Sequence, residues 1–463
     1  MPNNKKTRFL AIAAGCAVIA AFSAGLFVRN GMDSQPRERE VVAAQEMAAH
    51  FAELRNLESS ADGSNANLLR LFANVLFLVR QEYVEKTNTT EMAHGSLESM
   101  LASLNDPHSL FFKPDETARL EAAANGKLEG IGASLTLVQA KEGDLEKTML
   151  KVVAPFPNSP AERAGLLPGD YIDEVDGKWV ISHDPFHEIE TLRKQHAEFK
   201  KLREADQRAR ARLKNSLTLS DAVNRLTSFD AAKGSTNVSM TVIREGKPVK
   251  LEAPITRLTV APVGHKAIGK LGYVRVNFLG AATPKAVEKA IDELRPNIKG
   301  IVLDLRNAPG GQIEPAKQLL SRFVPGTALG QARFRADKAY KTRPISLVAA
   351  PKPYKIPMVV LVNKGTYNVA EFVASALKNQ AKSALIGEAT FGDASEIALF
   401  KLSDNSGFTL TLGRYLNPDG TEFHGTGVQP QVKVAEKPTK MGDPAADPAL
   451  KQAISTLTAK VGG

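Results

Sequence analysis

The sequence predicts a multidomain chain of mixed α/β and α+β class, preceded by a membrane segment. An unbroken apolar run from Phe9 to Val28 follows a basic start. Apolar residues then recur at helical spacing between Asn67 and Leu104, as expected for amphipathic helices. Farther along, residues 268–306 read as strand, helix and strand, a pattern that favours a sheet covered by helices. Together these patterns predict separate helical and α/β regions.

Composition sets broad limits on function. The chain has 463 residues, of which 43% are hydrophobic and 24% charged, so it can bury a substantial core in two to four domains. Its net charge of +10 is spread over the whole length and no nucleic-acid-binding motif accompanies it, so we predict no nucleic-acid partner. The single cysteine, Cys16, permits no internal disulfide.

Residues 1–30 form the predicted membrane segment. Lys5, Lys6 and Arg8 precede the apolar run, which at about 1.5 Å per residue is long enough to span a bilayer. Because the basic flank lies on the amino side, we expect the rest of the chain to be exported, in a periplasmic or other extracytoplasmic space, and tethered to the inner (cytoplasmic) membrane. A cleaved signal peptide is the alternative, since residues 21–25 are small enough for a signal peptidase.

Two regions follow the membrane segment. Residues 31–65 are polar and predict a tether with one modest helix near residues 41–57, and residues 66–126 predict a helical domain. A turn is expected at the segment Asn105-Asp106-Pro107-His108-Ser109, because aspartate before proline does not readily continue a helix. We assign His108 no catalytic or metal-binding role, since no partner motif accompanies it.

Residues 127–256 contain two sequence strings that resemble a PDZ domain. The first is Gly130-Ile131-Gly132-Ala133 followed by a strand-like segment, and the second is the longer string from Ser159 to Gly177. The resemblance implies a glycine loop whose backbone N–H groups bind a terminal carboxylate and a strand that pairs with a peptide. We therefore expect peptide or protein C-termini as partners, held by Gly130, Ile131, Gly132, Ala133 and Leu135.

A charged insertion at about residues 184–214 interrupts this region. Its apolar residues have helical spacing, which predicts a long helix or a helical hairpin. Docking on an envelope partner, on a second copy or on its own domain all remain open, as does a solvated helix that only provides reach. His183 and His187 stand four apart, but Pro185 lies between them and no further ligands are apparent, so we predict no metal there.

Residues 257–435 predict an α/β core domain, and residues 436–463 a C-terminal tail. The most characteristic motif of the core domain is LDLRNAPGG, from Leu303 to Gly311. A later strand at residues 357–363 leads into the turn at Asn368 and a helix over residues 370–378. Together with two later segments, at residues 408–415 and 425–430, these motifs resemble those of the carboxyl-terminal processing (tail-specific) serine peptidases. The resemblance extends over about residues 66–435. The resemblance implies that the turn at Gly310 and Gly311 supplies an oxyanion donor.

Three positions depart from the pattern of that family. The resemblance places Asn368 where the family has its nucleophilic serine, Asp393 where it has its lysine base, and Ile397 where a glutamine steadies the lysine. An asparagine amide is a poor nucleophile, and an aspartate with nothing to activate is only an acceptor. We predict a pseudoenzyme without a cofactor, in which Asn368 donates its amide hydrogens to Asp393.

The alternative is an active serine-type endopeptidase with a non-standard site. Ser375, Ser395 and His424 are the candidates for a rebuilt nucleophile or base, although a triad needs several groups aligned within hydrogen-bond reach. A metal held by Asp393, Glu396 and His424 has no supporting ligand spacing.

The predicted function is that of an exported, inactive homologue that binds peptide C-termini or unfolded segments as an adaptor or regulator. A purely architectural role, in which the insertion recruits an envelope partner, is a further alternative. The resemblance also implies self-association through helical arms around residues 66–104.

Overall fold

The computed structural model describes residues 63–232, 234–325, 328–336, 339–347, 353–435 and 440–461. The chain divides into two compact units, residues 1–93 and residues 94–463, and each is described by itself. The helices of the described residues are α3 (Gly63–Glu82), α4 (Thr89–Ala102), α5 (Pro114–Ala123), α6 (Pro160–Arg163), α7 (His187–Lys194), α8 (Phe199–Lys214), α9 (Leu219–Thr227), α10 (Thr283–Leu294), α11 (Ile313–Leu320), α12 (Val369–Asn379) and α13 (Pro448–Val461), with a 3₁₀ turn η2 (Arg295–Asn297).

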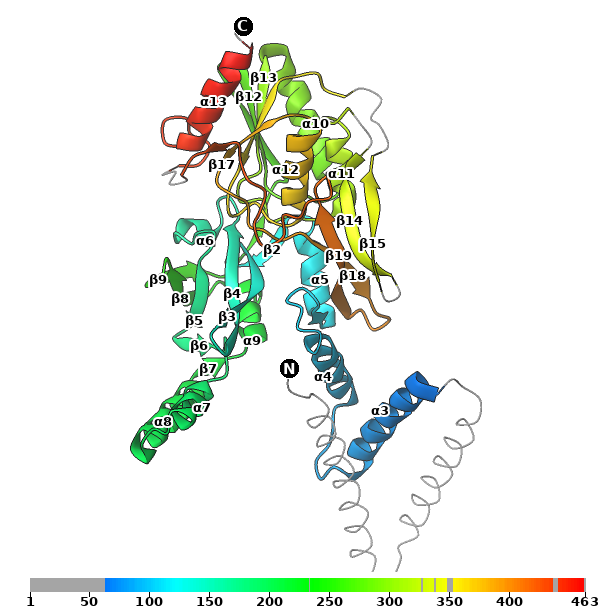
Figure 1. Ribbon diagram of the computed structural model, residues 1–463, viewed down its shortest axis with the longest axis vertical. Coiled ribbons are helices and arrows are strands. Elements are labelled where there is room, and N and C mark those ends of the chain that lie inside the picture. Colours follow the sequence, from blue (N-terminus) through cyan, green and yellow to red (C-terminus); the bar gives the residue numbers. More distant parts are fainter. Residues whose placement is uncertain are drawn as a thin grey trace, which may run out of the picture. The chain divides into compact units, whose positions relative to one another are not determined.

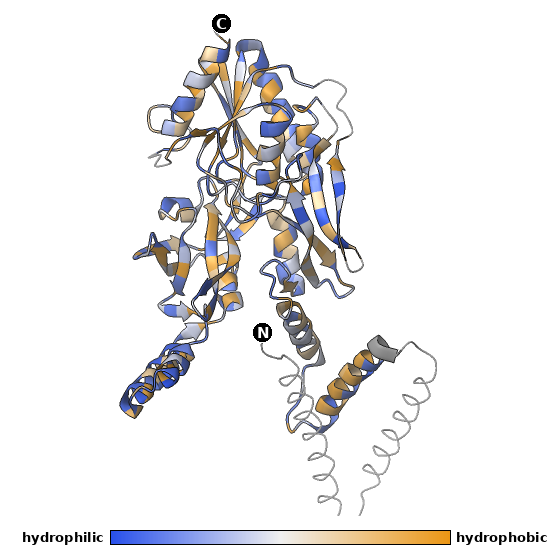
Figure 2. Ribbon diagram, viewed as in Figure 1, coloured by the Kyte–Doolittle hydropathy of each residue, from blue (hydrophilic) through white to orange (hydrophobic). Residues whose placement is uncertain are grey.

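The first unit contains α3, a helix with a largely apolar surface (Figure 2). Leu68 and Leu69 are well over half exposed within it. The predicted membrane segment at residues 9–28 and the predicted helix near residues 41–57 lie outside the described residues. Among the helices that the structure describes, none is both long and apolar enough to cross a membrane.

The predicted PDZ region forms a seven-stranded, mostly antiparallel sheet in the second unit. The strands follow the order β3-β4-β5-β6-β7, and β8 joins β5 to β9. Their bounds are β3 (Ala133–Glu142), β4 (Leu145–Pro155), β5 (Tyr171–Val175), β6 (Lys178–Val180), β7 (Ser216–Leu217), β8 (Asn237–Arg244) and β9 (Lys247–Pro254). Strand β3 therefore lies at an end of the sheet, with β4 on one side. The sheet and α9 share a core that includes Ile131, Leu150 and Leu226.

The predicted insertion forms a helical hairpin of α7 and α8, the second of the two forms expected from the sequence. An ion pair of 2.7 Å between Arg208 and Glu188 joins the two helices. The guanidinium of Arg212 lies 3.9 Å from the ring centroid of Trp179, which fixes the base of the hairpin on β6. Most of the hairpin surface is hydrophilic (Figure 2).

A second sheet of six strands forms the centre of the core domain. Its order is β11-β12-β13-β16-β17-β20, and all neighbours are parallel except β11 and β12. The strands are β11 (Val263–Ile268), β12 (Leu271–Val276), β13 (Gly300–Asp304), β16 (Met358–Val362), β17 (Ala384–Gly387) and β20 (Val432–Lys433). Strand β12 begins after a turn at Gly269, whose φ is +58°, and it is the first strand of the strand-helix-strand pattern predicted over residues 268–306.

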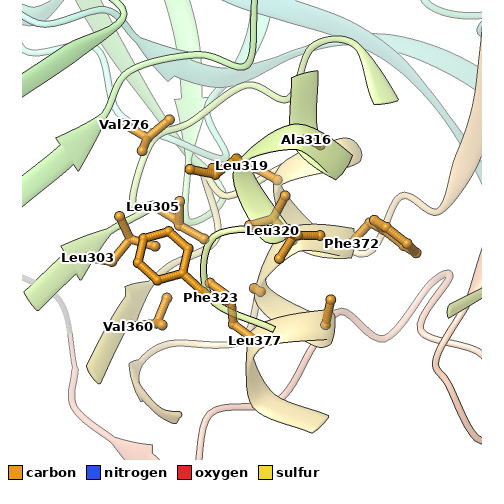
Figure 3. Packing of buried hydrophobic residues seen from close by; sticks show 14 of the residues in the cluster. Val276, Leu303, Leu305, Ala316, Leu319, Leu320, Phe323, Val360, Phe372 and Leu377 are labelled. Carbon is orange, nitrogen blue, oxygen red and sulfur yellow. The ribbon is translucent and has the colours of Figure 1, made fainter. Parts of the chain in front are cut away.

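Helices cover both faces of this sheet (Figure 1). Successive residues of β13 and β16 alternate between two cores, as the two-residue period of a strand requires. Leu303 and Val360 pack beneath α10, α11 and α12, where Leu320 and Phe372 close the core (Figure 3). The alternate residues, Val302, Val359 and Leu361 among them, pack against α13.

Helix α13 extends the core beyond the predicted boundary at residue 435. Leu450, Ala453 and Leu457 of this helix are fully buried on the sheet. The segment also completes a charge cluster, because the fully buried guanidinium of Arg306 binds Asp304 and reaches Asp447 at 2.7 and 2.8 Å. The expected tail is therefore an integral part of the core from Asp447 to Val461.

A smaller antiparallel sheet ties the start of the second unit to the core. Its strands are β1 (Phe111–Phe112), β14 (Ala328–Ala336), β15 (Ala339–Ser346), β18 (Ser395–Lys401) and β19 (Gly407–Leu416), and a separate pair is formed by β2 (Lys127–Gly130) and β10 (Thr256–Thr259). Phe111 pairs with Phe408, and Leu110 donates its N–H to Thr409 at 3.3 Å. This pairing holds the turn that contains His108 beside the core.

Candidate functional site

Asn368 lies on a strained turn between β16 and α12. Its φ of +51° and ψ of −116° are rare for a residue with a side chain, and such strain is characteristic of functional turns. The side chain is buried at 6% exposure, and its Nδ2 donates to the carbonyl of Ser395 at 2.8 Å. The expected bond from Asn368 to Asp393 is therefore wrong: the amide has found a backbone acceptor instead.

A second turn, at residues 307–311, lies against this one. Tyr367 donates its N–H to the carbonyl of Ala308 at 3.0 Å. Gly310 has a φ of +86°, and a Cβ added to it would lie 2.9 Å from the carbonyl oxygen of Tyr367, so glycine suits this approach. The N–H groups of Gly310 and Gly311 have no acceptor among the described residues. They are therefore free to bind an oxygen beside Asn368, the role of oxyanion donor that the family resemblance implies for this turn.

Glu371, which the sequence analysis did not single out, organises both halves of the site. It is fully buried and accepts hydrogen bonds from the N–H groups of Asn368, Gly392 and Asp393 at 2.7–3.0 Å, and from the hydroxyl of Thr390. Burial raises the pKa of Glu371 to about 8, although these donors favour its charged form. One carboxyl group thus fixes the position of the family serine and that of the family lysine.

Asp393 is buried against His108, a residue to which we assigned no role from the sequence. The Asp393 Oδ2 lies 2.8 Å from the His108 Nε2. Ser395 adds its backbone N–H at 2.9 Å and its side chain, and the hydroxyl of Tyr367 also bonds to this carboxylate. No partner for His108 was apparent from the sequence, because only the tertiary pairing of β1 with β19 brings its turn to the site.

The two members of this pair stabilise each other's charged forms. Burial acts to raise the pKa of Asp393, but the hydrogen bond and charge of His108 outweigh it and hold that pKa well below its usual range. Burial acts to lower the pKa of His108, but the bond to Asp393 and its charge leave the pKa raised. The aspartate is therefore paired with an imidazole, in the place where the resemblance puts the lysine base.

His424 lies at the edge of the same cluster. Its Nδ1 is 3.9 Å from the Asp393 Oδ1 and accepts the N–H of Ala394 at 3.3 Å. Burial and the nearby Arg414 hold the pKa of His424 below its ordinary value. Within the described ranges, no three His, Cys, Asp or Glu side chains are arranged to hold a metal ion.

The alternative nucleophiles are engaged elsewhere. Ser375 is 1% exposed, and its hydroxyl donates to Asn417 at 2.5 Å. Ser395 bonds to the acid Asp393 and not to a base. In the part of the chain that the structure describes, no serine or threonine hydroxyl bonds to the ring of His108 or to that of His424. Ile397, on β18 opposite Thr411, offers no polar atom in place of a glutamine amide.

The PDZ region contacts the core beside this site. The Thr136 hydroxyl on β3 lies 3.2 Å from that of Tyr367, and the Lys151 ammonium on β4 lies 4.4 Å from the ring centroid of Phe391. The predicted peptide-binding loop itself has positive φ at Gly130 (+92°) and Gly132 (+75°). Within that loop, the N–H of Ile131 donates to the carbonyl of Leu226 at 2.9 Å, while Ala133 and the half-buried Leu135 begin strand β3.

Comparison with known proteins identifies the relatives of this chain. Residues 270–434 match peptidase family S41, residues 151–198 match a PDZ domain, and residues 31–117 match the N-terminal domain of the activating protease CtpB. The chain is similar to the carboxyl-terminal processing peptidases. It is 27% identical to the carboxyl-terminal-processing protease of Synechocystis over 84% of this chain and 81% of that protein. It is also 29% identical to CtpA of Bacillus subtilis, over 78% and 67% of the two chains.

The solved structures agree on the fold. The chain matches the photosystem II D1 C-terminal processing protease with a TM-score of 0.58 and 24% identity, over 86% of this chain and 94% of that one. The predicted mixed α/β multidomain architecture, with a PDZ domain and a peptidase core, is confirmed.

The chemistry of this site follows from its free backbone N–H groups and from the side chains at residues 368 and 393. The free N–H groups of Gly310 and Gly311 and the N-terminus of α12 favour a negatively charged oxygen beside Asn368. Acyl transfer also needs a nucleophile and a base that removes its proton. The side chains at residues 368 and 393 are an amide bonded to a carbonyl and a carboxylate bonded to an imidazole, and neither can do this.

Proposed function

We propose that this protein is a proteolytically inactive carboxyl-terminal processing peptidase that binds protein segments through its PDZ domain and acts as an adaptor or regulator. The observation that carries the proposal is the ion pair between Asp393 and His108 at the position of the family base. A serine–lysine dyad depends on a neutral amine next to a hydroxyl, and the side chains at residues 368 and 393 supply neither group.

The preserved scaffold supports binding without cleavage. Glu371 still connects the turn of Asn368 to that of Asp393 through bonds of 2.8–3.0 Å. Thr136 and Tyr367 connect the PDZ strand β3 to the same site. A segment held on β3 would therefore lie next to a formed but unreactive carbonyl-binding site.

Its place in the cell is a further part of the proposal. The apolar run at residues 9–28 after a basic start supports export with an inner-membrane tether, so that the PDZ domain would sample extracytoplasmic proteins. The hydrophilic α7–α8 hairpin then provides a second surface for an envelope partner, and helices around residues 66–104 a surface for a second copy.

The test uses the full chain, purified in detergent and incubated with an unstructured protein substrate. We expect no fragments by mass spectrometry, and fragments that persist in Asn368→Ala but disappear in Ser375→Ala or Ser395→Ala would contradict the proposal. The positive control restores the family residues as Asn368→Ser, Asp393→Lys and Ile397→Gln.

The structure adds one requirement to this control. A lysine at residue 393 would face His108, and two cations there would repel each other. We therefore expect weak cleavage from the triple variant, and more cleavage when His108→Ala is added to it.

A further inference from the structure

The glycine loop of the PDZ domain is closed by its own helix. The carbonyl of Leu226, in the last turn of α9, accepts the N–H of Ile131 at 2.9 Å. A Cβ added to Gly130 would lie only 2.0 Å from that same oxygen. The carbonyl oxygen thus occupies the place that an oxygen of a bound carboxylate would need.

The loop is also fixed by its other backbone groups. Ile131 accepts the N–H of Ala161 at 2.8 Å, and Gly132 accepts that of Phe156 at 3.0 Å. The side chain of Ile131 is completely buried. An anion nest requires successive N–H groups that converge on one point, and here the first of them is already bonded. The N–H of Ile131 cannot join such a group of donors without movement of α9.

The neighbouring positive groups are neutralised as well. Glu129 precedes the loop, and its carboxylate binds the Nε of Arg257 at 2.8 Å and the N–H of Phe229 at 3.3 Å. Arg225, on α9, binds Asp176 at 2.6 Å. A terminal carboxylate would therefore lose its hydration and meet groups that already have acceptors.

The strand that would pair with a peptide remains usable. Strand β3 runs for ten residues, from Ala133 to Glu142, and its pairing partner in the sheet is β4 on one side. Leu135 and Leu137 are half-buried on this strand, next to Val223 of α9. An extended chain can add to such an edge through main-chain hydrogen bonds, with its alternate apolar side chains toward the PDZ core.

We infer that this PDZ domain binds internal, extended, apolar segments of unfolded proteins and does not depend on a free C-terminal carboxylate. This inference rests on the proposed function, and it chooses between the two ligands that the sequence left open. Affinity then comes from the edge of β3, while the closed loop contributes no charge recognition.

The test measures binding of three fluorescent peptides to the full chain in detergent by anisotropy. All share one apolar sequence, which ends in a free carboxylate in the first, in an amide in the second, and in four added Gly and Ser residues in the third. We expect the three dissociation constants to agree within about twofold. A free-carboxylate peptide that binds tenfold more tightly than the amide would overturn the inference alone.

A fourth peptide tests the strand. It carries methyl groups on alternate backbone nitrogens, which remove the donors that β3 would need, and we expect at least a tenfold loss of affinity. Unchanged binding of this peptide would overturn the inference. Failure of every peptide to bind would overturn the proposed function, and the inference with it.

Discussion

Two glycine turns of this molecule differ in whether their backbone N–H groups are already hydrogen-bonded within the protein. At Gly310 and Gly311 in the core the backbone N–H groups have no acceptor among the described residues, whereas at Ile131 in the PDZ loop the N–H is bonded to Leu226. Both turns contain glycines with positive φ. In both, a Cβ added to a glycine would clash with the backbone of another segment of the chain. The difference lies in which carbonyl approaches, and from which direction. A glycine motif therefore shows that a close approach exists, but not whether a ligand or the protein itself makes it.

The largest effect should come from Gly311→Ala in the core turn. The φ of Gly311 is +142°, and the new Cβ would lie 2.1 Å from the carbonyl oxygen of Leu279. Because both atoms belong to rigid backbone, we expect a loss of more than about 3 kcal/mol in the free energy of unfolding, measured by urea denaturation.

The matched control is Gly143→Ala. Gly143 also has a positive φ, +60°, but nothing lies within 4 Å of the added Cβ. We expect a loss of about 1 kcal/mol from backbone strain alone. Equal losses in the two variants would show that close approach does not set the shape of the core turn.

The second prediction concerns the ion pair beside the core turn. His108→Ala should destabilise the protein by about 3 kcal/mol near pH 5 to 6, because it leaves the buried Asp393 without its cation. The raised pKa of His108 makes its contribution complete below about pH 6.5 and lost as the pH rises through the folded-state pKa. The depressed pKa of Asp393 makes its contribution present above about pH 4 and lost in acid.

The measurement is the free energy of unfolding of wild type and variant from pH 4 to 9. The difference between them should shrink at the alkaline end, where the wild-type histidine becomes neutral. His265→Ala is the control, since His265 pairs with Glu293 on the surface and exposed pairs contribute about 0–1 kcal/mol. A pH-independent difference for His108→Ala would argue against an ion pair.

The third prediction opens the closed turn. In Gly130→Ala the new Cβ cannot coexist with the carbonyl of Leu226, so the last turn of α9 must move and release the N–H of Ile131. We expect a loss of about 2 kcal/mol in stability, and a new preference for free-carboxylate over amidated peptides. A variant that folds and binds both peptides equally would show that Leu226 does not control the loop.

The smallest effect should come from the link between the two regions. Tyr367→Phe removes the hydroxyl that lies 3.2 Å from Thr136 and also bonds to Asp393. We expect a loss of about 1 kcal/mol, the usual size for a neutral hydrogen bond, with peptide affinity unchanged. Thr136→Val should give the same loss, and the double variant no further loss if the two hydroxyls act as one pair.

Much of the core could be predicted from local sequence. The strand at β13, the strand at β16 and helix α12 follow from unbroken apolar runs with turns at fixed places, so a short window of sequence determines them. The same is true of the hairpin α7–α8. Helix α13 was missed, although Leu450, Ala453 and Leu457 have helical spacing, because the segment was read as a tail.

The partners within the site could not be predicted in this way. His108 meets Asp393 only because β1 pairs with β19, and no local pattern records that pairing. One signal was present: an aspartate at the position of a lysine calls for a new cation nearby. Glu371 also had a signal, since it stands three residues after Asn368, the spacing of a helix-capping pair. The bond between Ile131 and Leu226 had none, because its acceptor is a backbone atom.

The buried guanidinium of Arg306 has a consequence for folding during translation. It is fully buried between the carboxylates of Asp304 and Asp447. The second of these partners, Asp447, is synthesised after the strands of the core. A nascent chain that has reached residue 435 already contains every strand that the structure describes, yet it would have to keep an arginine half-neutralised inside an uncovered sheet. We therefore expect the core to remain open during translation and to close only after the helix that follows Asp447 has left the ribosome.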